Sequence, residues 1–232
     1  KRKGLNLETD TLLDEYVQLL HADSLNSLSK LVFIAQMAPI IGSTADTHLH
    51  RNDAMFNKAW LSISFADRFA INNRITNKSI QKAIREKNET YAYKVAFFIS
   101  STFKGNLQNK KKYFDYNMLK FYKETNDTVK YQVRAIDYYD NYYMTVSVDS
   151  IKKAASVKRS LQLSKQKPVP AINKTDTGNF KRRQVIQFAY SPMTQNFTSE
   201  LNNAALSFYK MFNDPAHTNK ALQWSKRANE FF

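Results

Sequence analysis

The stretch "FYKETNDTVKYQVRAIDYYDNYY" (residues 121–143) decides the fold. It joins an apolar helical pattern to a second one through a short polar turn, and the second helix ends in paired aromatic residues. The same plan returns near the carboxyl end as "FYKMFNDPAHTNKALQWSKRANEFF" (208–232), which shares the letters FYK-x-x-ND. A repeated helix–turn–helix unit indicates an array of stacked hairpins, because each hairpin buries its apolar face against a neighbour.

The tyrosines of 136–144 either pack inside the protein or stack on the bases of a nucleic acid. At about 100° per residue, residues 129–143 form two adjoining apolar stripes and one polar stripe. The stripes are Val129, Val133, Ile136, Tyr139 and Tyr143; then Tyr131, Ala135, Tyr138 and Tyr142; then Lys130, Arg134, Asp137 and Asn141. Base stacking needs exposed rings beside cations, whereas so wide an apolar arc is typical of a helix with neighbours on two sides. The pattern therefore favours packing.

The rest of the chain is also helical in character. Its 232 residues are 43% hydrophobic, which allows a sizeable core, and they contain only four glycines and five prolines. Long stretches without these breakers favour helices over hairpin sheets. Ten segments have helical spacing: 12–20, 23–38, 52–63, 64–88, 89–103, 109–125, 127–143, 147–155, 199–212 and 217–232. We expect an all-α fold of about ten helices, stacked as antiparallel hairpins in one domain.

Within that domain the sequence predicts three parts. Residues 1–156 form the helical-repeat array, 157–190 a basic, proline-containing irregular connection, and 191–232 a hairpin packed on the same array. The run "RRQVIQFAYS" (182–191) fits either a short strand or an extended linker.

The basic charge is concentrated in one segment. The chain has a formal charge of +15, and residues 152–183 hold ten Lys or Arg against one acid, Asp176. A solvated loop is the favoured interpretation. The alternative is a binding site for nucleic acid or another polyanion, which would weaken steeply with salt.

Several chemistries are excluded or unsupported by the sequence. The chain has no cysteine, and its glycines are too far apart for a phosphate-binding loop. His48 and His50 have no acidic or Cys partner at ligand spacing, and the longest apolar run (31–42) is too short to cross a bilayer. We therefore expect no catalytic residues, no metal, no cofactor and no membrane span.

The carboxyl-terminal hairpin resembles a tetratricopeptide repeat (TPR). Its first helix has the small pair Ala204 and Ala205 before Phe208, and its second has Ala221, Ser225 and Ala228. The loop is longer than in that motif, and Ser225 stands where a large ring is usual. The resemblance implies an α–α superhelical array.

Four phrases resemble the TPR-like helical region that follows the thioredoxin domain in a group of bacterial envelope proteins. They are "APIIGSTAD", "INNRITNKSIQKAI", "YYDNYYMTVSVDSIKK" and "SELNNAALSFYKMFNDPAHTNKALQWSKRA". The resemblance implies an upstream thioredoxin-like domain, with "KRKGLNLETD" in the connection to it, and a periplasmic or envelope location. It supplies no site residues, because that family's chemistry lies in the thioredoxin part.

Together these observations predict a non-catalytic helical-repeat scaffold that binds a protein or peptide or supports an attached domain. The candidate contact residues are aromatic or cationic side chains: Tyr116, Tyr122, Arg134, Lys181, Arg182 and Arg183.

Overall fold

The computed structural model describes residues 2–20, 27–51, 53–103, 106–165 and 192–231. These residues form eleven α-helices, one short π-helix and no strand, which confirms the all-α prediction. They divide into two compact units, 1–134 and 135–232.

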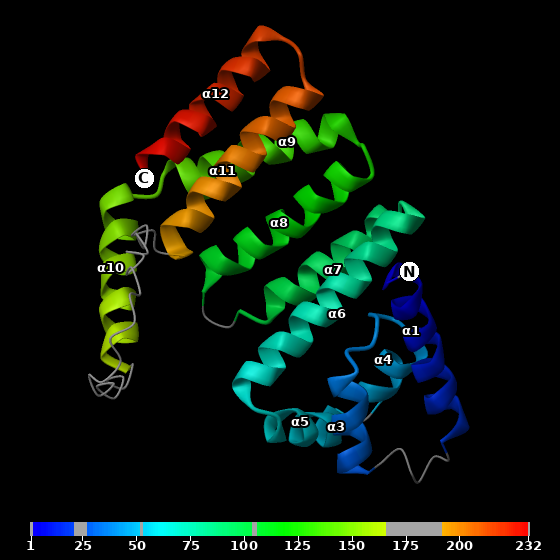
Figure 1. The fold of residues 1–232 in the computed structure, drawn as a ribbon. Helices are drawn as coiled ribbons and strands as arrows, with labels where there is room; N and C mark the ends of the chain where they lie inside the picture. Colours follow the sequence, from blue (N-terminus) through cyan, green and yellow to red (C-terminus); the bar gives the residue numbers. More distant parts are fainter. Residues whose placement is uncertain (1, 21–26, 52, 104–105, 166–191, 232) are drawn as a thin grey trace, which may run out of the picture. The chain divides into compact units, whose positions relative to one another are not determined.

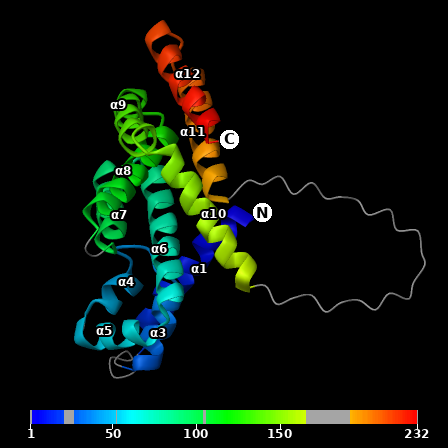
Figure 2. The same ribbon diagram turned by 90° about the vertical axis from the view of Figure 1, so that its left-hand side faces the viewer.

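Three consecutive helices form the centre of the first unit. They are α6 (Phe65–Glu86), α7 (Glu89–Ser101) and α8 (Leu107–Glu124), and they lie side by side with alternating direction (Figures 1 and 2). Side chains of Ser64, Asn88 and Asn106 cap their amino ends by accepting backbone N–H groups. Between α6 and α7, Lys87 adopts a left-handed conformation, which ends α6 and lets the chain reverse within two residues.

Four other helices of this unit pack around an apolar cluster that includes Leu13, Leu31, Leu49 and Ala59. They are α1 (Arg2–Leu19), α3 (Leu28–Gln36), α4 (Thr44–Leu49) and α5 (Asp53–Ser62). Helix α4 is absent from the ten predicted segments, because it has only six residues and two buried apolar side chains, too few for a periodic pattern. Its start is fixed by Ser43, whose hydroxyl accepts the N–H of Asp46.

The connection between α3 and α4 is held by side chains of α6 and α7. Lys78 donates to the carbonyl of Met37 and to the carboxylate of Asp10, at 3.1 and 2.7 Å. Ser79 accepts the N–H of Ile41, and the hydroxyl of Tyr91 donates to the Ile41 carbonyl at 2.6 Å. These bonds satisfy backbone groups that the loop cannot pair by itself.

The repeated FYK-x-x-ND motif corresponds to two helix-to-helix turns. In the first copy Asn126 is left-handed with φ 58°, and the Asp127 carboxylate accepts the N–H of Lys130 at the start of α9 (Thr128–Tyr139). In the second copy Asp214 accepts the N–H groups of Ala216 and His217 at the start of α12 (Pro215–Glu230). The shared aspartate therefore acts as the amino-terminal cap of the following helix in both places.

The second unit contains the π-helix η1 (Asp140–Met144), α10 (Val148–Lys165), α11 (Pro192–Met211) and α12 (Pro215–Glu230). Helices α11 and α12 form an antiparallel hairpin that is visible in both views (Figures 1 and 2). Trp224 and Phe208 are fully buried at its centre, with ring centroids 4.9 Å apart. Helix α10 continues to Lys165, so the helix extends into the segment 157–190 that the sequence predicts to be irregular. The rest of that segment lies outside the described residues.

The prediction that the tyrosines pack inside the protein is confirmed. The tyrosine rings of α9 and η1 are all buried: Tyr131, Tyr138, Tyr139, Tyr142 and Tyr143. The predicted apolar stripe is nevertheless incomplete, because Val129 and Val133 are 73% and 57% exposed. Both valines fall in the first unit, whereas Tyr139 and Tyr143 of the same stripe fall in the second. Neighbouring side chains therefore cover only the half of the stripe that contains Tyr139 and Tyr143.

Candidate docking groove

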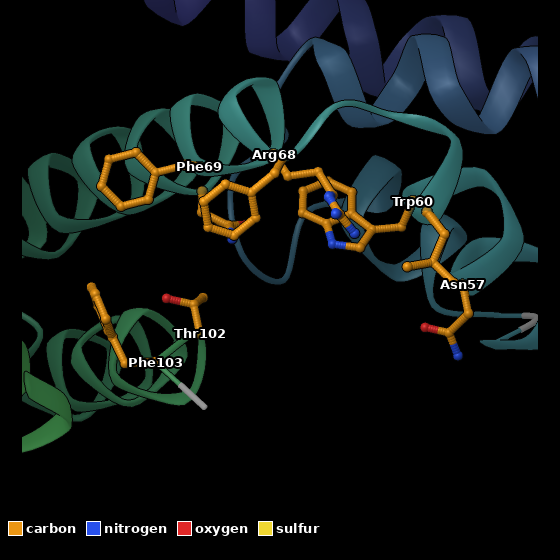
Figure 3. Close-up of a pocket in the computed structure, with 9 residues that line it drawn as sticks. Asn57, Trp60, Arg68, Phe69, Thr102 and Phe103 are labelled. Carbon is orange, nitrogen blue, oxygen red and sulfur yellow. The ribbon is translucent and has the colours of Figure 1, made fainter. Parts of the chain in front are cut away.

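An apolar groove of about 840 Å³ opens in the first unit, where α5, the start of α6 and the end of α7 meet (Figure 3). Its described lining is mostly aromatic or aliphatic. The residues are Asn57, Trp60 and Leu61 from α5, Phe65, Arg68, Phe69 and Asn72 from α6, and Thr102 and Phe103 after α7.

The groove exists because its helices differ in length. Helix α6 has 22 residues and α7 has 13, which correspond to about 33 and 20 Å at 1.5 Å per residue. Since α7 runs back along α6 from their shared turn, it ends before the first turns of α6. The amino-terminal turns of α6 therefore extend beyond the end of α7, whereas α7 covers the rest of α6.

Three large apolar side chains of the groove are open to solvent. Leu61 is 71% exposed, Phe65 78% and Phe69 45%. Single exposed apolar residues are ordinary, but a contiguous group in a concave surface marks an interaction site.

The rings at the two ends of the groove are supported from behind. Trp60 stacks on Phe56 with centroids 5.8 Å apart, and Phe103 stacks on Tyr113 at 4.2 Å with an interplanar angle of 13°. Rings held in this way lose little conformational freedom on binding, so the Trp60 and Phe103 sides of the groove are preformed.

Arg68 is the charged residue of the described lining. Its side chain is half-buried and extends towards the indole of Trp60 (Figure 3). The buried Nε of Arg68 has no hydrogen-bond partner among the described residues. An unsatisfied buried donor costs free energy until a ligand or water accepts from it.

Two of the predicted contact residues, Tyr122 and Arg134, belong to a polar network that connects α7, α8 and α9. Tyr122 is buried, not exposed, and its hydroxyl donates to Glu89 at 2.7 Å. Lys130 donates to the other Glu89 oxygen at 2.6 Å, and its ammonium lies 5.5 Å from the centre of the Tyr122 ring. Tyr122 is thus engaged in helix packing, and its ring is not part of a contact surface.

Arg134, like Tyr122, is engaged with a side chain of a neighbouring helix. Its guanidinium lies 3.5 Å from a carboxylate oxygen of the buried Asp115, whose other oxygen pairs with Lys111 at 2.7 Å. Tyr116, next along α8, is 41% exposed. Lys181, Arg182 and Arg183 lie outside the described residues.

The electrostatics of this network stabilise the packed state. Hydrogen bonds from Lys130 and then from Tyr122 lower the pKa of Glu89 below its ordinary value. Burial is the main cause that raises the pKa of Tyr122 above its ordinary value. The Glu89 carboxylate accepts a hydrogen bond from the Tyr122 phenol and another from the Lys130 ammonium, so its charge is satisfied. These bonds connect α7 with α8 and α9.

In the described part of the chain, no group of three or more His, Asp or Glu side chains is placed to hold a metal ion. His50 lies with its ring against Phe56, at 4.7 Å, and 3.7 Å from Asp46. Burial and the neighbouring Arg51 lower the pKa of His48. Among these described residues, no helix is long and apolar enough to cross a membrane.

The groove residues are missing from the predicted contact set. Phe65 and Phe69 share helical spacing with Ile75, Ile80 and Ala83, and that spacing indicates the core. The structure buries the last three but exposes the two phenylalanines. The available signal was the difference in length between the segments 64–88 and 89–103, which predicts an overhang at the start of the longer helix.

Comparisons with known proteins give no match: no family model fits the chain, and no curated protein or solved structure matches it. In particular, nothing in them links the chain to a thioredoxin-associated helical region.

Proposed function

We propose that this chain is a non-catalytic helical scaffold that binds a segment of another protein in the groove of its first unit. The observation that supports the proposal best is the exposure of Leu61, Phe65 and Phe69 together in one hollow. Burying such side chains against a partner releases water from apolar surface, which is the main source of affinity in protein association.

The composition of the lining fits a protein partner. Trp, Phe and Arg are enriched in the centres of protein interfaces, and they supply most of the binding energy. Trp60, Phe65, Arg68 and Phe103 provide this combination within one groove. Helical arrays bind extended or helical segments in hollows of this kind.

The repeated cap motif supports a TPR-like arrangement of the hairpins as part of the same proposal. Asp127 and Asp214 perform the same role in two helix–turn–helix units. The resemblance to helical regions of envelope thioredoxin-family proteins adds a second partner, an attached thioredoxin-like domain that the scaffold would position. Purifying the chain together with the segment encoded upstream and testing for cross-links would examine this second part separately.

The test of groove binding starts from selection with a phage-displayed library of random dodecapeptides on the immobilised chain. Peptides that are enriched are then synthesised, and their affinities for wild type and variants are measured by calorimetry. Phe65→Ala with Phe69→Ala should weaken binding by about tenfold or more, the effect expected for interface anchors. Val129→Ala with Val133→Ala is the matched control, because these two residues are exposed in the same unit but do not line the groove. Enrichment of no peptide, or equal loss in both double variants, would overturn the proposal.

A further inference from the structure

We infer that the groove selects apolar segments that carry a carboxylate, and that Arg68 recognises this group. The inference rests on the proposed function, and it concerns which partner the groove accepts. It follows from the position of one cation among described lining residues that are otherwise neutral.

The guanidinium of Arg68 remains charged at every accessible pH and presents a planar set of N–H donors. Its Nε is buried without a hydrogen-bond partner in the described part of the chain. Carboxylates match the fork geometry of arginine and form short, charge-assisted bonds with it. Since the Nε itself is enclosed, an incoming carboxylate would pair with the outer N–H groups of the guanidinium.

The described lining offers no carboxylate of its own. Its other polar side chains are Asn57, Asn72 and Thr102, and the hydroxyl of Thr102 already donates to the carbonyl of Ile99 at 2.7 Å. The nearest acid along α6 is Asp67, which accepts from the hydroxyl of Ser64 at the start of the helix. The described lining therefore supplies no counter-charge for Arg68, and a carboxylate of the ligand would provide one.

The charge of the whole chain acts in the same direction. Residues 1–134, the unit that contains the groove, hold 21 Lys or Arg against 13 Asp or Glu, a formal charge of +8, which attracts acidic partners at long range and disfavours basic ones. The exposed Leu61, Phe65 and Phe69 require an apolar body next to the acid. The occupant that fits both requirements is a peptide segment with an Asp or Glu beside large aliphatic or aromatic residues.

The same library distinguishes this inference from the proposal on which it rests. Wild type should enrich peptides in which Asp or Glu neighbours an aromatic or aliphatic residue, and Arg68→Glu should enrich peptides with Lys or Arg at that position. For one wild-type peptide, replacing its acid by the matching amide should weaken binding to wild type about tenfold, as expected for one charge-assisted bond. The same replacement should have no effect on Arg68→Gln, and circular dichroism of this variant should match wild type.

The other outcomes are also decisive. Enriched peptides that need Phe65 and Phe69 but show no preference for acids would overturn the role of Arg68 and leave groove binding intact. Enrichment of no peptide would overturn both. A concentration-dependent dimer of the wild-type chain that Leu61→Ser abolishes would show that a second copy occupies the groove, and would overturn the acidic-peptide inference.

Discussion

The indole N–H of Trp224 donates to a carboxylate oxygen of Asp140 at 3.0 Å, although the two residues are 84 positions apart in the chain. The other oxygen of Asp140 accepts from Lys220 at 2.8 Å. Asp140 is the first residue of the π-helix η1, where the wider turn replaces the α-helical one. One carboxylate therefore fastens this turn to two residues of α12.

Trp224→Phe should destabilise the protein by about 2 kcal/mol, because Asp140 loses a donor to its charged oxygen and the core loses part of a ring. The free energy of unfolding from urea denaturation is the measurement. Leu222→Ala provides the control, since Leu222 is exposed on the same helix and should cost less than about 0.5 kcal/mol. Equal values for the two variants would mean that the indole–carboxylate bond contributes nothing.

Tyr138→Ala should cost about 3 kcal/mol, the range for removing a large buried ring. The Tyr138 ring contacts Tyr139, Tyr142 and Tyr143 with centroids 5.1 to 5.8 Å apart. Thermal melts of the variant should be compared with those of Tyr209→Ala, an exposed tyrosine on α11. A loss under about 0.5 kcal/mol for Tyr138→Ala, typical of surface sites, would place these rings at the surface.

Glu89→Gln should lower stability at pH 7, and the difference from wild type should vanish in acid. The folded protein holds the pKa of Glu89 below its ordinary value of 4.5, so folding favours the ionised carboxylate. This stabilisation is present above about pH 4.5 and is lost as the pH falls through the lower, folded-state value. The effect should be less than about 1 kcal/mol, because the Glu89–Lys130 pair is partly exposed.

A double-mutant cycle with Lys130→Met provides the control for Glu89. The coupling between the two substitutions, measured by urea denaturation across the pH range, should disappear along with the ionised carboxylate. A coupling that stays constant down to strongly acidic pH would contradict the ionic character of this bond.

Gly42→Ala should cost about 1 kcal/mol, because Gly42 has φ 78° and side chains other than glycine disfavour this region. Crowding does not contribute, since no atom lies within 4 Å of an added Cβ. Gly42→Asn should cost less than Gly42→Ala, because asparagine tolerates left-handed backbone better. Chemical denaturation of both variants is the measurement, and a neutral Gly42→Ala would show that the backbone strain is absent.

The helices other than α4 could be predicted from the sequence because their apolar periodicity is local, and the caps in the repeated motif depend on local chemistry as well. The FYK-x-x-ND motif is an example: Asp127 and Asp214 cap helices through bonds to residues two or three positions away. The burial of Tyr138 and Tyr142 also followed from periodicity alone. These features need no knowledge of distant partners.

Periodicity alone does not predict features that depend on distant partners. The π-helix starts at Asp140, where the carboxylate meets Trp224 and Lys220 of another helix. The exposure of Phe65 depends on where α7 ends, and the burial of Tyr122 depends on Glu89 of that same helix. Periodicity identifies which face of a helix is apolar, but it does not show how far along the helix a neighbour covers that face.

The two tryptophans of this chain are placed so that each senses a different part of the molecule. Trp60 borders the groove of the first unit, and Trp224 is fully enclosed in the second. Since the chain has only two tryptophans, Trp224→Phe leaves Trp60 as the single indole emitter, and its fluorescence should shift when a peptide fills the groove. Conversely, Trp60→Phe leaves an emitter that responds only when the aromatic core of the second unit opens. Intrinsic fluorescence can thus follow ligand capture and unfolding as separate optical signals, without any attached dye.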